Sequence, residues 1–238
     1  PAKKLRLDSP HSLDIFLDSR PNERLRTYVR GRLQHDFTIT PDSRNVYGQI
    51  LKQSHVQLDQ FWMKFDIAQK LFITLGQQPV HWGVGRFWNP SDFLNQERKD
   101  PFAIFDQRLG LGLAKFHLPI ESLGWNFYTI INFDRAGTTQ DIGGAFRAEF
   151  LYEQTEVSLS TAIRHDRPFS SGISVSSGLG PIDLKAEWSL FKNIQQSFYE
   201  GNLDFNTFEF PTEISNKEKW MSQTLIGFEL AIGYNDND

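Results

Sequence analysis

The sequence predicts an all-β protein: an antiparallel up-and-down transmembrane β-barrel, with about eleven strands of a larger, even-numbered barrel present. Three observations support this fold class. Apolar and polar residues alternate with a period of two along many segments. Several segments reach about ten residues, whereas soluble strands average about 5–6 and tilted membrane strands need about 9–11. The connections between them also alternate between short and long.

The strands are bounded by turn-forming residues such as Gly, Pro, Asn and Asp. We predict strands at residues 13–18, 24–37, 61–67, 71–75, 107–119, 125–135, 145–153, 156–165, 173–179, 182–191 and 222–234. Short connections fall at 19–23, 69–70, 120–124, 155 and 180–181, and longer ones at 39–54, 82–106, 136–144, 166–171 and 192–220. Tight turns at one end and longer loops at the other are typical of outer-membrane barrels.

Each predicted strand has one uncharged face and one charged face. In 61–67, for example, Phe61, Met63 and Phe65 alternate with Lys64 and Asp66. The uncharged rows are expected to face lipid, because Arg or Lys there costs roughly 2–4 kcal/mol at mid-depth. These rows are 25/27/29/31/33, 61/63/65/67, 71/73/75, 109/111/113, 127/129/131/133, 146/148/150/152, 157/159/161/163, 182/184/186/188/190 and 226/228/230/232/234. Aromatic residues near strand ends suit an interfacial girdle: Trp125, Tyr152, Trp188, Phe191 and Tyr234.

Composition excludes several other classes. The chain has 238 residues, a net charge of −4 and no cysteine, so a disulfide framework and a cysteine metal site are excluded. Its basic residues are scattered, which argues against a nucleic-acid partner. No run of about 18 apolar residues predicts a membrane helix. The histidines show no metal-ligand spacing, and no cofactor or catalytic motif is recognised, so we predict neither a metal, a cofactor nor an enzyme.

Strand parity predicts that residues 1–238 are one barrel domain, incomplete at both ends. If the short turns are periplasmic, the first and last predicted strands both run inward, whereas complete bacterial barrels have an even strand number. We therefore expect a fragment of a larger barrel, and its oligomeric state is not predicted.

Four arginines form a ladder along one face of the second predicted strand: Arg24, Arg26, Arg30 and Arg32. One hypothesis is an electropositive wall that favours anionic solutes. The alternative is structural pairing with acids on neighbouring strands, including Asp14 and Asp18, and the two are compatible. The full set of predicted channel-lining residues is Arg24, Arg26, Arg30, Arg32, Lys64, Arg108, Arg147, Glu149, Arg164, Lys185 and Glu187.

The long connection 82–106 has two possible roles. It could fold into the lumen as a constriction, because its aromatic residues need a surface to pack against, or it could be an external cap. The predicted constriction residues are Trp82, Arg86, Trp88, Asn89 and Asp92.

A motif in this region resembles a known group of proteins. Residues 75–92 read LGQQPVHWGVGRFWNPSD, and Asp100-Pro101 and DQRLG (106–110) follow downstream. These segments are similar to stretches in porin-like outer-membrane proteins, including alginate-export-like barrels and related uncharacterised families of Gram-negative bacteria. The match is specific over about 35 residues. The resemblance implies a passive channel or export pore in the outer membrane.

The expected function is therefore passive diffusion or export of small polar or anionic solutes, or of an extended polymer, through a barrel that contacts outer-membrane lipid. Three alternatives remain open: a structural or adhesion barrel with a plugged lumen, a soluble β-rich binding protein, and a barrel-embedded hydrolase.

Overall fold

The computed structural model describes residues 10–40, 42–44, 48, 50–95, 108–165, 167–194, 198–201, 210–214 and 218–230. Tyr234 and residues 96–107 of the long connection, both included in the predictions above, lie outside these ranges. Within them, no helix is long and apolar enough to cross a membrane.

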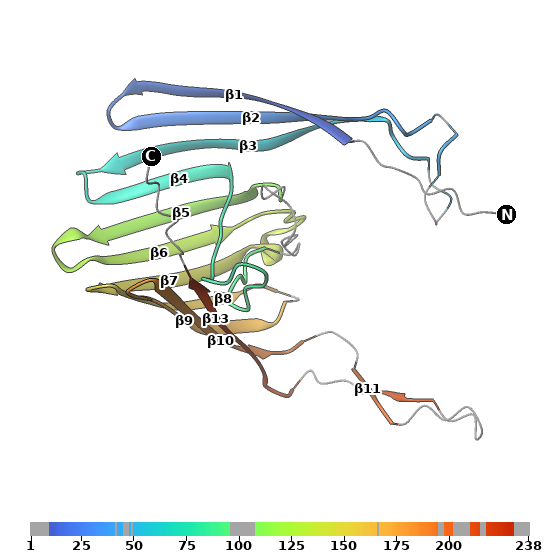
Figure 1. The fold of residues 1–238 in the computed structure, drawn as a ribbon. Helices are drawn as coiled ribbons and strands as arrows, with labels where there is room; N and C mark the ends of the chain where they lie inside the picture. The colour runs from blue at the N-terminus through green and yellow to red at the C-terminus, as the bar shows by residue number, and fades with distance from the viewer. Residues whose placement is uncertain are drawn as a thin grey trace, which may run out of the picture.

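Eleven strands form one antiparallel sheet in which each strand pairs with its sequence neighbour, up to the final pairing of β10 with β13 (Figure 1). They are β1 (Pro10–Asn22), β2 (Leu25–Asp36), β3 (Ser54–Ile67), β4 (Leu71–Gln78), β5 (Leu111–Ile120), β6 (Trp125–Asn132), β7 (Gly143–Tyr152), β8 (Thr155–Ile163), β9 (Phe169–Leu179), β10 (Ile182–Lys192) and β13 (Met221–Leu230). The predicted up-and-down antiparallel architecture and strand number are confirmed. A separate small hairpin, β11 (Phe198–Glu200) with β12 (Thr212–Ile214), lies within the last connection.

The connections alternate as predicted, with tight turns at one end of the sheet and longer segments at the other (Figure 1). The β3–β4 turn illustrates the backbone geometry of a short connection. Ala68 and Gln69 both have positive φ, at 53° and 58°, and the Lys70 amide donates to the Ile67 carbonyl. This is the backbone of a type I′ turn, whose twist matches that of paired strands.

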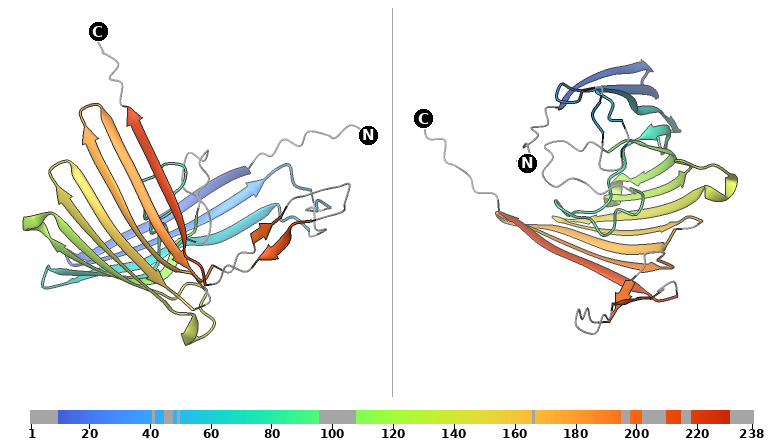
Figure 2. Two further views of the ribbon diagram at one scale, coloured as in Figure 1. Left: turned by 90° about the horizontal axis from the view of Figure 1, so that it is seen from below. Right: turned by 90° about the vertical axis from the view of Figure 1, so that its right-hand side faces the viewer.

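The sheet is curved and not closed, with β1 and β13 at its two edges (Figure 2). Its convex face carries the predicted uncharged rows. Large apolar side chains are exposed there along most strands, from Phe61 on β3 and Phe146 on β7 to Ile226 on β13, which is 83% exposed. The opposite, concave face carries the charged rows. Closure into a larger barrel stays a prediction.

One predicted face is wrong. Residues 111 and 113 were expected to point to lipid, but both leucines lie on the concave face and are buried, Leu113 completely. The register explains this, because Ala114 pairs with the exposed Leu75 and Ile131, so the even-numbered residues of β5 face outward. Phe191, assigned above to a girdle, also faces inward and contacts Phe93, with ring centroids 5.7 Å apart.

Candidate functional site: a charged concave face and the β4–β5 connection

The described part of the β4–β5 connection folds onto the concave face instead of extending away from the sheet (Figure 2). Its apolar residues pack on side chains from three strands and form a hydrophobic cluster: Val80, Trp82 and Leu94 from the connection, Leu111 and Leu113 from β5, Ile130 from β6 and Ala145 from β7. This cluster accounts for the inward leucines of β5. Leu111 and Leu113 form part of the apolar surface that the connection covers.

A single carboxylate on β10 anchors the connection to the same concave face, three strands beyond β7. Glu187 of β10 is 1% exposed. Its Oε1 accepts hydrogen bonds from the amides of Val84 (2.6 Å) and Gly85 (2.8 Å). Its Oε2 accepts bonds from the Ser91 amide (3.1 Å) and hydroxyl (2.7 Å). Four donors around one buried carboxylate satisfy a charge that would otherwise be costly to bury.

Two glycines permit this close approach. Gly83 has φ 93°, and a Cβ there would lie 2.7 Å from Asn89 Cβ and 2.9 Å from Glu187 Oε1. At Gly85 a Cβ would collide with the Trp88 carbonyl. Glycine is needed at Gly83 for the positive φ, and at both positions because a Cβ would clash with neighbouring atoms.

A second set of bonds ties the base of the connection together. Arg108 Nη1 lies 2.8 Å from Asp92 Oδ2. The Asn95 side-chain amide donates to the Asp92 carboxylate (2.7 Å) and to the Val80 carbonyl (2.6 Å). Of the five predicted constriction residues, Trp82 is therefore in the hydrophobic cluster and Asp92 in this polar base.

The other three predicted constriction residues differ in setting. Arg86 and Trp88 are exposed, and Asn89 is partly buried. Trp88 and Asn89 also line a cavity of about 640 Å³ between the connection and the loop-side ends of β7 to β10, together with Arg108 and Arg164. A constricting role for this group stays a prediction.

The strands opposite the connection carry small hydroxyl side chains. Ser158, Ser174 and Ser189 are almost fully buried, and the Ser158 hydroxyl lies 3.1 Å from that of Ser174. Arg147 donates to Ser158 (2.8 Å) and to Glu149 (2.7 Å), with its guanidinium 5.8 Å from the centre of the Trp82 ring. Small residues here leave room for the connection.

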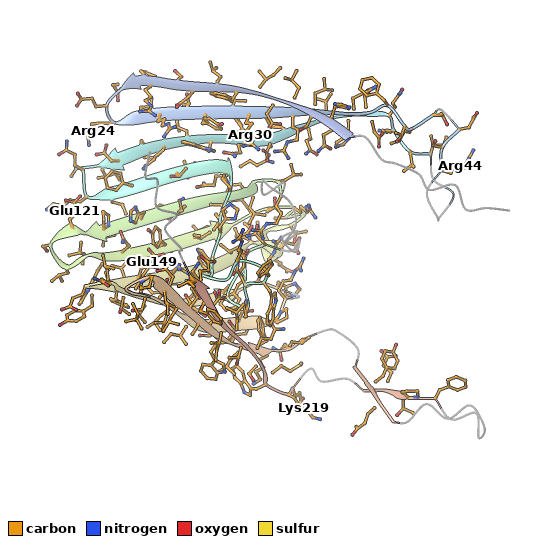
Figure 3. The ribbon with its side chains drawn as sticks, viewed as in Figure 1. Arg24, Arg30, Arg44, Glu121, Glu149 and Lys219 are labelled. Atoms are coloured by element: carbon orange, nitrogen blue, oxygen red, sulfur yellow. The ribbon has the colours of Figure 1, made fainter. Side chains whose placement is uncertain are left out.

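The arginine ladder is paired with acids on β1 and β3. Figure 3 labels Arg24 at the turn end of the sheet and Arg30 further along β2. The pairs are Arg24–Asp66 (3.0 Å), Arg26–Asp18 (2.8 Å), Arg30–Asp59 (2.7 Å) and Arg32–Asp14 (2.9 Å). The ladder thus carries as many acids as bases, which supports the pairing hypothesis. An effect on solute selectivity remains a prediction.

The most buried acid of this network, Asp59, was not among the predicted site residues. It is 2% exposed and sits at a register shift opposite Arg30 and Gly31, where β3 carries one extra residue. The signal was present in the sequence. Exposed Val56, Leu58 and Phe61 are spaced by two and then three, as a β-bulge requires.

The remaining predicted lining residues lie as follows. Lys185 pairs with Glu229 at 3.1 Å, and Arg164 Nη2 donates to the Asp134 carbonyl at 2.6 Å. Lys64 lies over the Phe72 ring, 5.2 Å from its centre. Acids outnumber bases on the concave rows of β7 to β10, and bases outnumber acids on those of β2 to β5. A field across the concave face follows from this distribution.

Comparison with known proteins gives a limited result. No family model matches the chain, and no curated protein matches it. Among solved structures, it is similar to Salmonella typhi OmpF in complex with daunomycin, with 11% sequence identity and a TM-score of 0.47. The alignment covers 80% of this chain and 60% of that one, so the chain spans less than two thirds of its length. The resemblance to alginate-export-like barrels therefore stays a prediction, and the fold assignment rests on strand order, turns and faces.

Proposed function

We propose that this protein is part of an outer-membrane channel through which small polar solutes diffuse passively. The observation that carries the proposal is the division of one curved sheet into two faces. Large apolar side chains are exposed on the convex face, and ion pairs and hydroxyls line the concave face.

This division favours lipid outside and water inside. Soluble monomers rarely expose contiguous apolar patches larger than a few hundred Å². Here exposed Leu, Ile, Phe and Trp side chains recur on strand after strand of the same face. A soluble β-rich protein would bury that face, and in this sheet the charged face holds most of the buried residues instead.

Solute passage would be controlled by the β4–β5 connection. Because Glu187 holds it across β10 while its apolar side seats on β5 to β7, it occupies one half of the concave face. Among the described residues, the connection is bonded to the ion-paired face of β1 to β3 through the Gly110 amide, which donates to the Asp59 carbonyl (3.1 Å). The solute path would then run along this second half, with the connection as its border. The constricting role of Arg86, Trp88, Asn89 and Asp92 remains a prediction.

A narrowed path favours small solutes over an extended polymer. The paired arginine ladder does not supply an excess of positive charge, so any preference for anions must come from another part of the face.

A second candidate is a structural barrel with a plugged lumen. The observation that favours it is the packed cluster of Trp82, Leu111 and Leu113, which has the character of a small core. Both candidates share the membrane location and differ only in whether water crosses.

Electrical recording separates the two. The protein purified in detergent would be added to a planar lipid bilayer in 1 M KCl, and stepwise conductance increases are expected for a channel. Stable insertion, shown by protease protection of the strands in vesicles, without any conductance would contradict the channel and support the plugged barrel. Failure to associate with lipid at all would overturn both.

A further inference from the structure

Two lysines stand apart from the ion-pair network of the concave face. Lys64 on β3 and Lys115 on β5 lie in one row across the sheet, because Lys64 pairs with Thr74 and Thr74 pairs with Lys115. Their Cα atoms are therefore about 10 Å apart, two strand spacings. By register, both side chains project from the concave side of the sheet, the side that Thr74 also faces.

Neither lysine has an acidic partner among the residues that the structure describes. The other arginine and lysine side chains on the concave strand rows or the β1–β2 turn within those residues have a carboxylate at salt-bridge distance: Arg20, Arg24, Arg26, Arg30, Arg32, Arg147 and Lys185. Lys64 has a ring contact with Phe72, which leaves its charge uncompensated. Lys115 is only partly exposed.

The neighbouring acids are already engaged. Asp66, next on the same face of β3, is bonded to Arg24, and Asp18, on the far side of Arg26, is bonded to that arginine. On the other side, Lys115 pairs with the apolar Ile130. The two ammonium groups repel each other with no counter-charge between them.

The next row toward the tight turns is aromatic. His117 stacks on Tyr128 with ring centroids 4.4 Å apart, and Phe72 lies 6.0 Å from His117 on the other side. His117 Nε2 is also 2.9 Å from Asn126 Oδ1. The rings themselves carry no negative charge, and the acid of this row, Asp66, is the one already bonded to Arg24.

We infer that Lys64 and Lys115 form a binding site for an oxyanion, the carboxylate or phosphate group of a solute. Two ammonium groups on neighbouring positions of one face attract such a group as point charges, without the planar fork that arginine would impose. On the proposed function, this site would be the source of anion preference that the paired arginines do not provide. The attraction falls as ionic strength rises.

Equilibrium binding tests the site without requiring conduction. Inorganic phosphate and succinate would each be titrated into the detergent-solubilised protein at low salt and followed by calorimetry. Binding of at least one is expected, weakened about tenfold or more in the K64Q/K115Q double variant. Lys70→Gln is the control, because it removes a lysine charge from the exposed β3–β4 turn, outside the predicted channel-lining residues, and it should bind as the unaltered protein does.

A second double variant, which keeps both positive charges, controls for loss of binding through misfolding. K64R/K115R should retain binding, so loss in the glutamine pair with retention in the arginine pair assigns the effect to charge. No binding to the unaltered protein, or equal binding by the glutamine pair, would overturn the inference.

Reversal potentials in a KCl gradient then connect the site to transport. The ratio of chloride to potassium permeability should fall in K64Q/K115Q and change little in K70Q. Normal phosphate or succinate binding without conductance would refute the proposed channel alone, whereas conductance without such binding would refute the lysine site alone.

Discussion

Replacing Glu187 by glutamine should loosen the β4–β5 connection from the sheet. The carboxylate receives three amide donors and one hydroxyl, and glutamine keeps an oxygen for Val84 and Gly85. Its NH₂ group would then face the Ser91 amide, leaving that buried N–H without an acceptor. Such a loss costs about 1–3 kcal/mol, with the weaker neutral bonds adding to it. We expect about 2–3 kcal/mol, a roughly 30- to 150-fold rise in the detached population.

Amide hydrogen exchange measures this population directly. In the unaltered protein the amides of Val84, Gly85 and Ser91 should be protected, and in E187Q their protection should fall by that factor while the strands remain protected. Single-channel records should show more frequent open-level fluctuations.

The matched control is Glu229→Gln, which removes one carboxylate from the same face, where it pairs with the partly buried Lys185 and does not touch the connection. Unchanged protection at the three amides in E187Q would refute the assignment of Glu187 as the anchor.

Three further substitutions test the two faces and the ion-pair network. Leu113→Ala should lower the free energy of unfolding by about 2–5 kcal/mol, because it leaves a cavity in the cluster that contains Trp82. A denaturant midpoint equal to that of the unaltered protein would show that the connection does not pack on Leu113. Leu159→Arg, on the convex face, should cost roughly 2–4 kcal/mol when the protein folds into lipid, and full folding yield in vesicles would argue against a lipid-facing position. Asp59→Asn should cost about 1–3 kcal/mol, because Arg30 and Arg32 would then share the single carboxylate of Asp14. A loss below about 1 kcal/mol in urea titration would show that Asp59 is dispensable.

Alternation alone predicted most of the sheet because, in a strand, side-chain direction is set by position. Phe61, Met63 and Phe65 could be assigned to one face without knowing their neighbours. Alternation does not identify the correct face where an apolar residue points inward, as Leu113 does. Its partner is Trp82, some thirty residues earlier in the sequence, and nothing in the local pattern of β5 distinguishes a lipid contact from a contact with an inserted connection.

Bulges and small residues account for other differences. The first half of β3 was left out of the predicted strand because the extra residue at Asp59 interrupts the period of two. The start of β9, Phe169–Leu179, was predicted four residues late because its serines give no apolar alternation.

The site was predictable in part. The period-two alternation of side chains along each strand placed Glu187 and the arginine ladder on the charged face. The anchoring bonds of Glu187 join residues about a hundred positions apart, and which acid pairs with which arginine depends on register. Neither follows from the sequence pattern.

The central claim is that lipid meets the convex face and water the concave one, and cysteine scanning along β3 tests it most directly. The chain has no native cysteine, so each of residues 61–66 can be replaced in turn and spin-labelled without background. In lipid vesicles, labels at 62, 64 and 66 should collide mainly with a water-soluble nickel complex, and labels at 61, 63 and 65 mainly with oxygen dissolved in the bilayer. The opposite phase, or equal access to both reagents at all six positions, would contradict the account.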